Sequence, residues 1–250
     1  MVTGVSSSMS NSGVRPRKVA LFVTCLVDLF RPSVGFAAIK LLEDAGCSVE
    51  VPPLQVCCGQ PAYNTGDRQT TRDIARQVID AFEGFEAIVV PSGSCGGMLS
   101  HHYPGLFDDD PGLKTRAQDL AGRTYELMSF LVDVLGLKGL KARYEEVVTY
   151  HDSCHLGRGC GVYEEPRSIL NAIPGVELVT PHESEVCCGS AGTYNIDQPE
   201  IAAGLGRRRT IAIDVHEIAG HAHMDMITGV MESSDLGLRF VLDFIRSVAR

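Results

Sequence analysis

The sequence Cys57-Cys58-Gly59-Gln60-Pro61-Ala62-Tyr63-Asn64 decides the fold, because a similar sequence occurs again later in the chain. The second copy is Cys187-Cys188-Gly189-Ser190-Ala191-Gly192-Thr193-Tyr194-Asn195. Each copy is preceded by a single cysteine at nearly the same interval: Cys25 lies 32 residues before Cys57, and Cys154 lies 33 residues before Cys187. Packing alone gives no reason to repeat adjacent thiols, so this pattern indicates an internal duplication of one structural unit.

Around these motifs, short apolar runs alternate with segments of helical periodicity. The strand-like runs are residues 18–24, 48–51, 86–90, 145–151 and 176–179. The helix-like segments are residues 34–45, 67–82, 164–173 and 198–213. This alternation is typical of parallel strands joined by crossover helices. The sequence therefore predicts an α/β protein with two similar halves, each a parallel sheet flanked by helices.

The repeat also predicts where the units begin and end. Residues 1–17 are rich in Ser, Gly and Asn and predict a disordered tail. We expect a first unit at 18–135, which ends in a helical insert from residue 105 onward, a linker at 136–144, and a second unit at 145–250.

Composition excludes several functional classes. The chain has 250 residues, is 44% hydrophobic and carries a net charge of −9, so it predicts a globular protein that does not bind nucleic acid. No run of about 18 apolar residues predicts a transmembrane segment, and the tail lacks the apolar core of a signal peptide. We therefore expect a cytoplasmic protein, in which the nine cysteines, an odd number, are not explained by disulfides.

The positions of the cysteines indicate a ligand site. In parallel sheets, ligands bind at the carboxyl ends of the strands, where Cys25, Cys57 and Cys95 are predicted to lie. Cys57 and Cys58 share a site only if the backbone turns between them, and Gly59 makes such a turn easy. Clustered thiolates favour iron–sulfur clusters, zinc or copper(I). Cys47 is assigned to packing, since free cysteines are commonly buried.

The same residues carry a resemblance to a known family. The duplicated Cys…Cys-Cys-Gly pattern resembles the cysteine-rich CCG domain found in heterodisulfide reductase, in the glycolate oxidase iron–sulfur subunit and in the lactate utilization protein A family. Leu21-Phe22-Val23-Thr24-Cys25, Pro91-Ser92-Gly93-Ser94-Cys95 and Thr124-Tyr125-Glu126-Leu127 are most similar to the last of these. Tyr150-His151-Asp152-Ser153-Cys154 is similar to both that family and the glycolate oxidase subunit.

The resemblance implies that each complete motif binds an iron–sulfur cluster. In the first half the ligands would be Cys25, Cys57, Cys58 and Cys95, enough for a [4Fe–4S] cluster. The second half offers Cys154, Cys187 and Cys188, with Met224 at the fourth position. His221, His223 and Cys160 are the candidate replacements for the fourth ligand. A second cluster with one of these ligands, a cluster with an open iron and an empty site all stay open.

The resemblance further implies an electron-transfer subunit that works with other subunits of an L-lactate or 2-hydroxy acid oxidation complex. No Gly-x-Gly-x-x-Gly motif follows a strand, so hydride chemistry is expected in a partner. Two alternatives stay open: a thiol/disulfide redox enzyme of the heterodisulfide reductase type, and a non-catalytic metal-binding scaffold. His151 and His155 flank Cys154 and are candidates for hydrogen bonds to a cluster sulfur.

Overall fold

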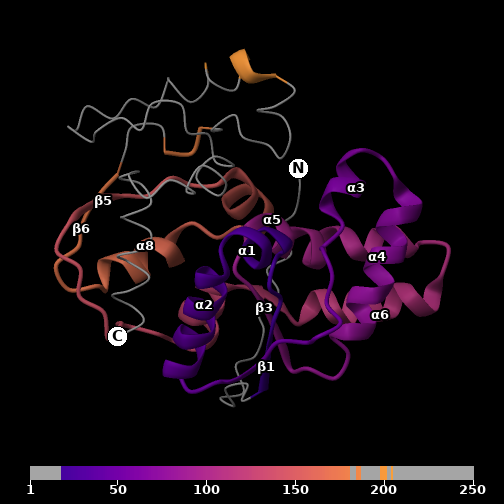
Figure 1. Cartoon of the computed structure of the whole chain (residues 1–250), viewed down its shortest axis with the longest axis horizontal. Helices are drawn as coiled ribbons and strands as arrows, with labels where there is room; N and C mark the ends of the chain where they lie inside the picture. The colour runs from indigo at the N-terminus through magenta and orange to yellow at the C-terminus, as the bar shows by residue number, and fades with distance from the viewer. Residues whose placement is uncertain (1–17, 181–183, 187–197, 202–203, 205–250) are drawn as a thin grey trace, which may run out of the picture.

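The computed structural model describes residues 18–180, 184–186, 198–201 and 204. Within them, two parallel sheets form the framework (Figure 1). The first sheet has the order β2-β1-β3-β4, and the second pairs β5 with β6. Their bounds are β1 (Lys18–Leu21), β2 (Ser48–Glu50), β3 (Ala87–Val90), β4 (Thr124–Glu126), β5 (Val147–Thr149) and β6 (Glu177–Val179).

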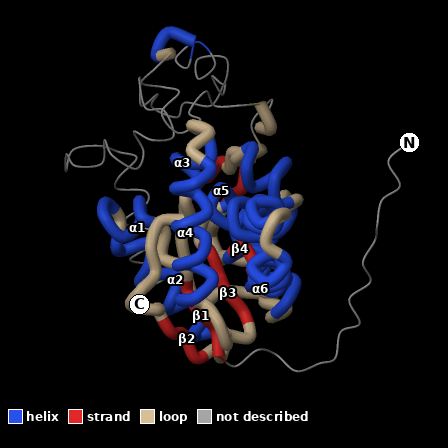
Figure 2. The backbone as a smooth tube through the Cα atoms, turned by 90° about the vertical axis from the view of Figure 1, so that its right-hand side faces the viewer, coloured by secondary structure: helices blue, strands red, loops and turns tan. Residues whose placement is uncertain are grey.

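Helices connect and cover these strands. In the first half they are α1 (Cys25–Phe30), α2 (Pro32–Asp44), α3 (Gln60–Asn64), α4 (Arg68–Ala81), α5 (Gly93–Gly97), the π-helix η1 (Met98–His102), the 3₁₀-helix η2 (Tyr103–Phe107), α6 (Pro111–Gly122), α7 (Leu127–Ser129) and the π-helix η3 (Phe130–Val134). Around the second sheet they are the π-helix η4 (His155–Gly159) and α8 (Glu164–Asn171). α1, α3 and α5 lie at the same end of the first sheet (Figure 2).

Alternation along β1 divides the core into two layers. Ala20 and Phe22 face α4 and α6, where they pack with Val78 and Leu120 in one apolar cluster. Val19 and Leu21 face the other way, toward a second cluster that contains α2 and η3 residues. Successive side chains of a strand point to opposite faces, so a strand that is buried on both sides is apolar throughout. β3 follows the same rule, and all four of its residues are buried.

Local sequence signals explain where the long helices begin. The Asp67 carboxylate accepts a hydrogen bond from Thr70 N at 3.0 Å and caps α4. Asp110 caps α6 in the same way through Leu113 N at 3.1 Å, and Pro111 occupies the first turn. The buried residues of α4 are Thr71, Ala75, Val78 and Ile79, which form one face at helical spacing.

The second sheet belongs to a strand–helix–strand unit. β5 and β6 are parallel, with Val148 opposite Leu178, and η4 and α8 connect them. Ile169 of α8 joins the apolar cluster below α2 and η3, so this unit packs against the first half.

These observations confirm the predicted α/β class with parallel sheets flanked by helices. They correct one detail: residues 124–126, predicted within a helical insert, form β4 at the edge of the first sheet. Edge pairing with β3, through Ile88 opposite Thr124, overrides the local pattern. The short helices α1, α3 and α5 were also not predicted. The predicted helix at 198–213 lies almost entirely outside the described residues.

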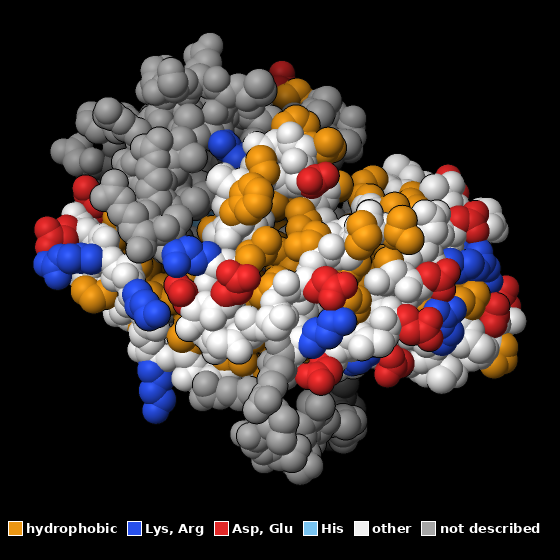
Figure 3. All heavy atoms as spheres, turned by 60° about the horizontal axis from the view of Figure 1, so that its bottom comes forward, with side chains coloured by type: hydrophobic (Ala, Val, Ile, Leu, Met, Phe, Trp, Pro, Cys, Tyr) orange, Lys and Arg blue, Asp and Glu red, His pale blue; other side chains and the backbone are white. Residues whose placement is uncertain are grey.

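Charged side chains of both signs are interspersed on the surface. Arg116 pairs with Asp80 at 2.8 Å and with Glu83 at 2.9 Å, which joins α6 to the end of α4 and its following turn. Figure 3 shows acidic and basic side chains next to one another on the right-hand part of one face. In the described part of the chain, no helix has the length and apolar character needed to span a bilayer.

Candidate metal centre

Four cysteine thiols from three strand ends meet at the carboxyl edge of the first sheet. Cys25 follows β1, Cys57 and Cys58 follow β2, and Cys95 follows β3. The Cys25 and Cys57 sulfurs are 3.7 Å apart, and the Cys58 and Cys95 sulfurs are 3.3 Å apart. Cys57 and Cys58 are adjacent in the chain, which joins the two pairs. We call these residues the four-thiol cluster.

The backbone around each thiol explains this convergence. Thr24 ends the first strand segment and caps α1, because its Oγ1 accepts a hydrogen bond of 3.3 Å from Val27 N. Gly59 adopts a left-handed conformation with φ of 80° immediately before α3. A Cβ at Gly59 would also lie 3.3 Å from the side chain of Ile74. The sequence predicted a turn at this glycine, and the structure confirms it.

The four-thiol cluster has a buried side and an accessible side. Cys58 and Cys95 are buried, whereas Cys25 and Cys57 are half-buried. On the buried side, Tyr103 is fully enclosed, and its hydroxyl donates a hydrogen bond of 3.0 Å to the backbone carbonyl of Cys58. The four-thiol cluster is therefore fixed to the core through Cys58 and Cys95, and it reaches the surface through Cys25 and Cys57.

Hydrogen bonds within the cluster divide the thiols into donors and acceptors. The pKa of Cys57 is lowered mainly because the Cys25 thiol donates a hydrogen bond to it, and the pKa of Cys95 is lowered mainly by a hydrogen bond from Cys58. The pKa values of Cys25 and Cys58 are raised, because each thiol donates to a neighbouring sulfur and each is removed from water. Removing the remaining protons would leave like charges in contact, which a bound cation would offset.

The donor set fits an iron–sulfur cluster. Its four ligands are all soft sulfur atoms, the number and type that hold a four-iron cluster. In residues 18–180 and the short described segments beyond them, no group of three or more ligating side chains surrounds a single ion position. The thiols instead lie as two contacting pairs, in an arrangement set by their mutual hydrogen bonds.

Two serines beside Cys95 extend the site. The hydroxyls of Ser92 and Ser94 both hydrogen-bond the Cys95 sulfur, and the two hydroxyl oxygens are 3.3 Å apart. Sequence reasoning missed these serines and Tyr103. The serines could have been predicted from the segment Ser92-Gly93-Ser94-Cys95, because a helical turn there brings both hydroxyls close to the Cys95 sulfur.

The second half contributes Cys154 and Cys160 to the described structure. Cys154 immediately precedes η4 and is half-buried, with its sulfur 3.9 Å from His155 Nδ1. His151 Nδ1 lies 2.5 Å from the carbonyl oxygen of Ser184. The other predicted residues of this site lie outside the described residues: Cys187, Cys188, His221, His223 and Met224.

Cys160 lies against the helix that carries Cys95. Its sulfur is 3.2 Å from the carbonyl oxygen of Gly93, and burial raises the pKa of its thiol to about 11. A Cβ at Gly93 would be 2.7 Å from Leu156 Cα. Gly93 allows η4 of the second half to pack directly on α5.

The packing prediction for Cys47 is confirmed. Cys47 is buried in the apolar cluster of α2 and η3, away from the other thiols. His101 and His102, which follow the Cys95 segment, are exposed.

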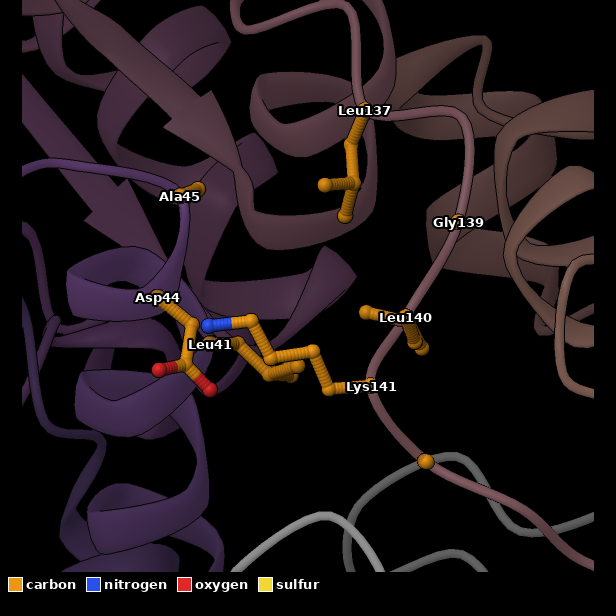
Figure 4. Close-up of a pocket in the computed structure, with 8 residues that line it drawn as sticks. Leu41, Asp44, Ala45, Leu137, Gly139, Leu140 and Lys141 are labelled. Carbon is orange, nitrogen blue, oxygen red and sulfur yellow. The ribbon is translucent and has the colours of Figure 1, made fainter.

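A small cavity elsewhere does not offer an alternative site. It has a volume of about 70 Å³ and lies between the end of α2 and residues 137–142 (Figure 4). Leu137 and Leu140 point into the space beside Leu41, and the stem of Lys141 extends toward α2 (Figure 4). Ligand pockets are several times larger, at roughly 300–1,000 Å³, so this cavity is too small for a substrate or cofactor.

The fold and the four-thiol cluster are those of a cysteine-rich protein with a repeated strand-end thiol motif, and comparison with known proteins gives the family. The cysteine-rich CCG domain matches residues 19–100 and again residues 148–219. The chain therefore belongs to the family of duplicated CCG-domain proteins, as its resemblance predicted.

The similar curated proteins specify the branch of this family. Lactate utilization protein A of Macrococcus caseolyticus is 45% identical over 188 residues, which cover 75% of this chain and 76% of the relative. The protein of the same name from Oceanobacillus iheyensis is 43% identical, with 77% and 79% covered. The one from Bacillus velezensis is 45% identical, with 79% and 82% covered.

Proposed function

We propose that this protein is an iron–sulfur electron-transfer subunit in the oxidation of L-lactate or a related 2-hydroxy acid. The observation that carries the proposal is the four-thiol cluster, in which three separate strand ends bring only soft sulfur ligands together. The cysteine-rich domain and the relatives named for lactate utilization support the same role. A bound cluster would supply one-electron redox chemistry, which thiols alone do not provide at this site.

Different residues of the site would play different roles in holding such an iron–sulfur cluster. Cys58 and Cys95 are the buried anchors, and Tyr103 fixes the loop that carries Cys58. Cys25 and Cys57 lie on the accessible side, which is the side from which we expect electrons to enter or leave. The hydroxyls of Ser92 and Ser94 donate to the Cys95 sulfur and would stabilise its negative charge.

We extend the proposal to the second half and to the setting of the protein. The unit at 18–135 would hold one [4Fe–4S] cluster, and the unit at 145–250, joined by the linker 136–144, would hold a second site with Cys154, Cys187 and Cys188. The fourth ligand of that site would come from His221, His223 or Cys160. The protein would work in the cytoplasm with the other subunits of the oxidation complex.

Metal analysis tests this proposal directly. After anaerobic purification, about four irons and four sulfides per chain would support one cluster, and about eight of each would support two. A reduced sample should give the electron paramagnetic resonance signal of an iron–sulfur cluster. Stoichiometric zinc without iron would overturn the proposal, and so would iron-free protein that supports lactate oxidation at the full rate.

Substitution of single cysteines tests the ligand assignment. Cys57→Ser should lose about four irons per chain, because it removes one of four thiolates from the first site. Cys47→Ser is the matched control, since Cys47 is buried in a different apolar cluster and should leave the iron content unchanged. Unchanged iron in Cys57→Ser would contradict the assignment.

A further inference from the structure

A stack of one arginine and two rings lies at the edge of the apolar cluster that contains Cys58 and Cys95, because Tyr63 packs against that apolar cluster. The Arg68 guanidinium carbon is 4.4 Å from the centroid of the Tyr63 ring, and the Tyr63 and His102 rings are 4.7 Å apart with an angle of 37° between their planes. Tyr63 belongs to α3, Arg68 begins α4 and His102 ends η1. Three separate elements therefore bring these side chains together, while Arg68 and His102 remain exposed.

The charged groups that act on His102 are basic. Burial lowers the pKa of His102, and its other causes are the nearby basic groups His101, His155 and Arg68. No carboxylate is among these causes. Asp67, the acid next to Arg68 in sequence, uses its carboxylate to accept hydrogen bonds from Thr70 N at 3.0 Å and Thr70 Oγ1 at 2.7 Å.

Arg68 differs from the other arginines of its own helix. Arg72 pairs with Asp109 at 2.7 Å, and Arg76 pairs with Asp73 at 2.7 Å. Arg68 forms no ion pair with any residue in the described ranges. In a protein with a net charge of −9, Arg68 thus has no acidic partner among the described residues, and an anion would supply the missing charge.

The position of the stack connects it to the thiols of both halves. Tyr63 follows Cys58 by five residues, and His102 follows Cys95 by seven. His155, which influences His102, is the neighbour of Cys154 in the second half. The stack is thus built from segments that follow Cys58 and Cys95 in the chain, and it lies within electrostatic range of His155 in the second half.

We propose that Arg68, Tyr63 and His102 form a binding site for a small carboxylate, with His155 at its edge. The planar guanidinium matches a carboxylate with two parallel hydrogen bonds, and an imidazole adds a donor. The Tyr63 ring contacts both side chains and holds them in place. A single guanidinium favours a monoanion, and the acidic protein disfavours a polyanion. The identity of the ligand as a 2-hydroxy acid rests on the proposed function.

Equilibrium dialysis of radiolabelled L-lactate with the anaerobically prepared, iron-loaded full chain tests this site. Arg68→Gln and His102→Gln should each weaken binding about tenfold or more, the effect of losing a hydrogen bond to a charged group. Arg76→Gln is the matched control, because Arg76 lies on the same helix but already has an acidic partner, and it should bind like the unmodified protein. Acetate should compete weakly with lactate, and phosphate should not compete at equal concentration.

Unchanged binding in Arg68→Gln would overturn the site, and equal competition by phosphate would overturn its assignment to a carboxylate. Iron content is measured in every sample, which separates this inference from the proposed function. Iron-loaded protein that fails to bind lactate contradicts only the carboxylate site. Protein that contains no iron but binds lactate through Arg68 contradicts only the proposed iron–sulfur cluster.

Discussion

Gly93 of α5 lies directly against Leu156 of η4, so close that a Cβ at Gly93 would be 2.7 Å from Leu156 Cα. The atom that it would meet is backbone, which cannot rotate out of the way. Because Gly93 is two residues from Cys95, and Leu156 is two residues from Cys154, this contact fixes the first half to the second close to both cysteines. The two halves of the duplication therefore meet at their thiol-bearing segments.

Gly93→Ala should destabilise the protein, since the added methyl group forces α5 and η4 apart. We expect a loss of about 1–3 kcal/mol in the free energy of unfolding, the usual cost of overpacking. Urea unfolding followed by circular dichroism measures this loss. The control is Gly105→Ala, because a Cβ at Gly105 meets no atom within 4 Å. Equal stability of the two variants would show that the contact is not tight.

Tyr103→Phe should weaken the attachment of the four-thiol cluster to the core. The variant leaves the carbonyl oxygen of Cys58 without the hydrogen bond of 3.0 Å that the Tyr103 hydroxyl donates. An unsatisfied buried acceptor costs about 1–3 kcal/mol, so we expect a lower free energy of unfolding and faster loss of iron to a chelator. Tyr125→Phe retains the ring contact between Tyr125 and Phe130 and serves as the control. Iron release at the same rate in both variants would argue against a role for the Tyr103 hydroxyl.

The sequence allowed the strand ends and the cysteine set to be predicted, because both depend on local patterns. Apolar runs that stop at a cysteine or a proline identified β1 and β3, and Gly59 identified the turn between adjacent thiols. The convergence of Cys25, Cys57, Cys58 and Cys95 then followed from parallel topology.

Other features depend on partners that are distant in sequence, so local patterns did not reveal them. β4 exists because Thr124 pairs with Ile88, 36 residues earlier. The role of Gly93 depends on Leu156, which belongs to the other half of the chain. The stack of Arg68, Tyr63 and His102 likewise forms only when α3, α4 and η1 are placed side by side.

Ser92→Ala should lower the reduction potential of the proposed cluster. Hydrogen bonds to ligand sulfurs stabilise the more negative, reduced state, and the Ser92 hydroxyl is one of two that reach the Cys95 sulfur. One hydrogen bond of about 0.5–1.5 kcal/mol corresponds to a shift of roughly 20–65 mV for a one-electron couple. Redox titration followed by electron paramagnetic resonance measures the shift. Ser100→Ala is the control, since its hydroxyl donates to the carbonyl oxygen of Gly96 at 2.7 Å. Equal potentials in the two variants would contradict the prediction.

Glu126 should make stability depend on pH near neutrality. It is buried at the start of α7, where its carboxylate accepts hydrogen bonds from Met128 N at 2.7 Å and Ser129 N at 3.3 Å. Burial is the main cause that raises the pKa of this carboxyl group from 4.5 to about 7, and the charge of Glu165 adds to it. The folded state therefore binds more protons than the unfolded state between these two pH values.

Stability should consequently fall as the pH rises from about 4.5 to 7 and change little through this group above that range. The full effect is on the order of 3 kcal/mol, since one pKa unit corresponds to about 1.4 kcal/mol. Glu126→Gln retains an oxygen that can accept the two backbone hydrogen bonds but does not ionise, so its advantage over the unmodified protein should increase across this range. Urea unfolding at a series of pH values measures the difference. Glu177→Gln, at an exposed position of β6, should show no such trend. A constant difference between Glu126→Gln and the unmodified protein from pH 4.5 to 8 would show that folding does not raise the pKa of Glu126.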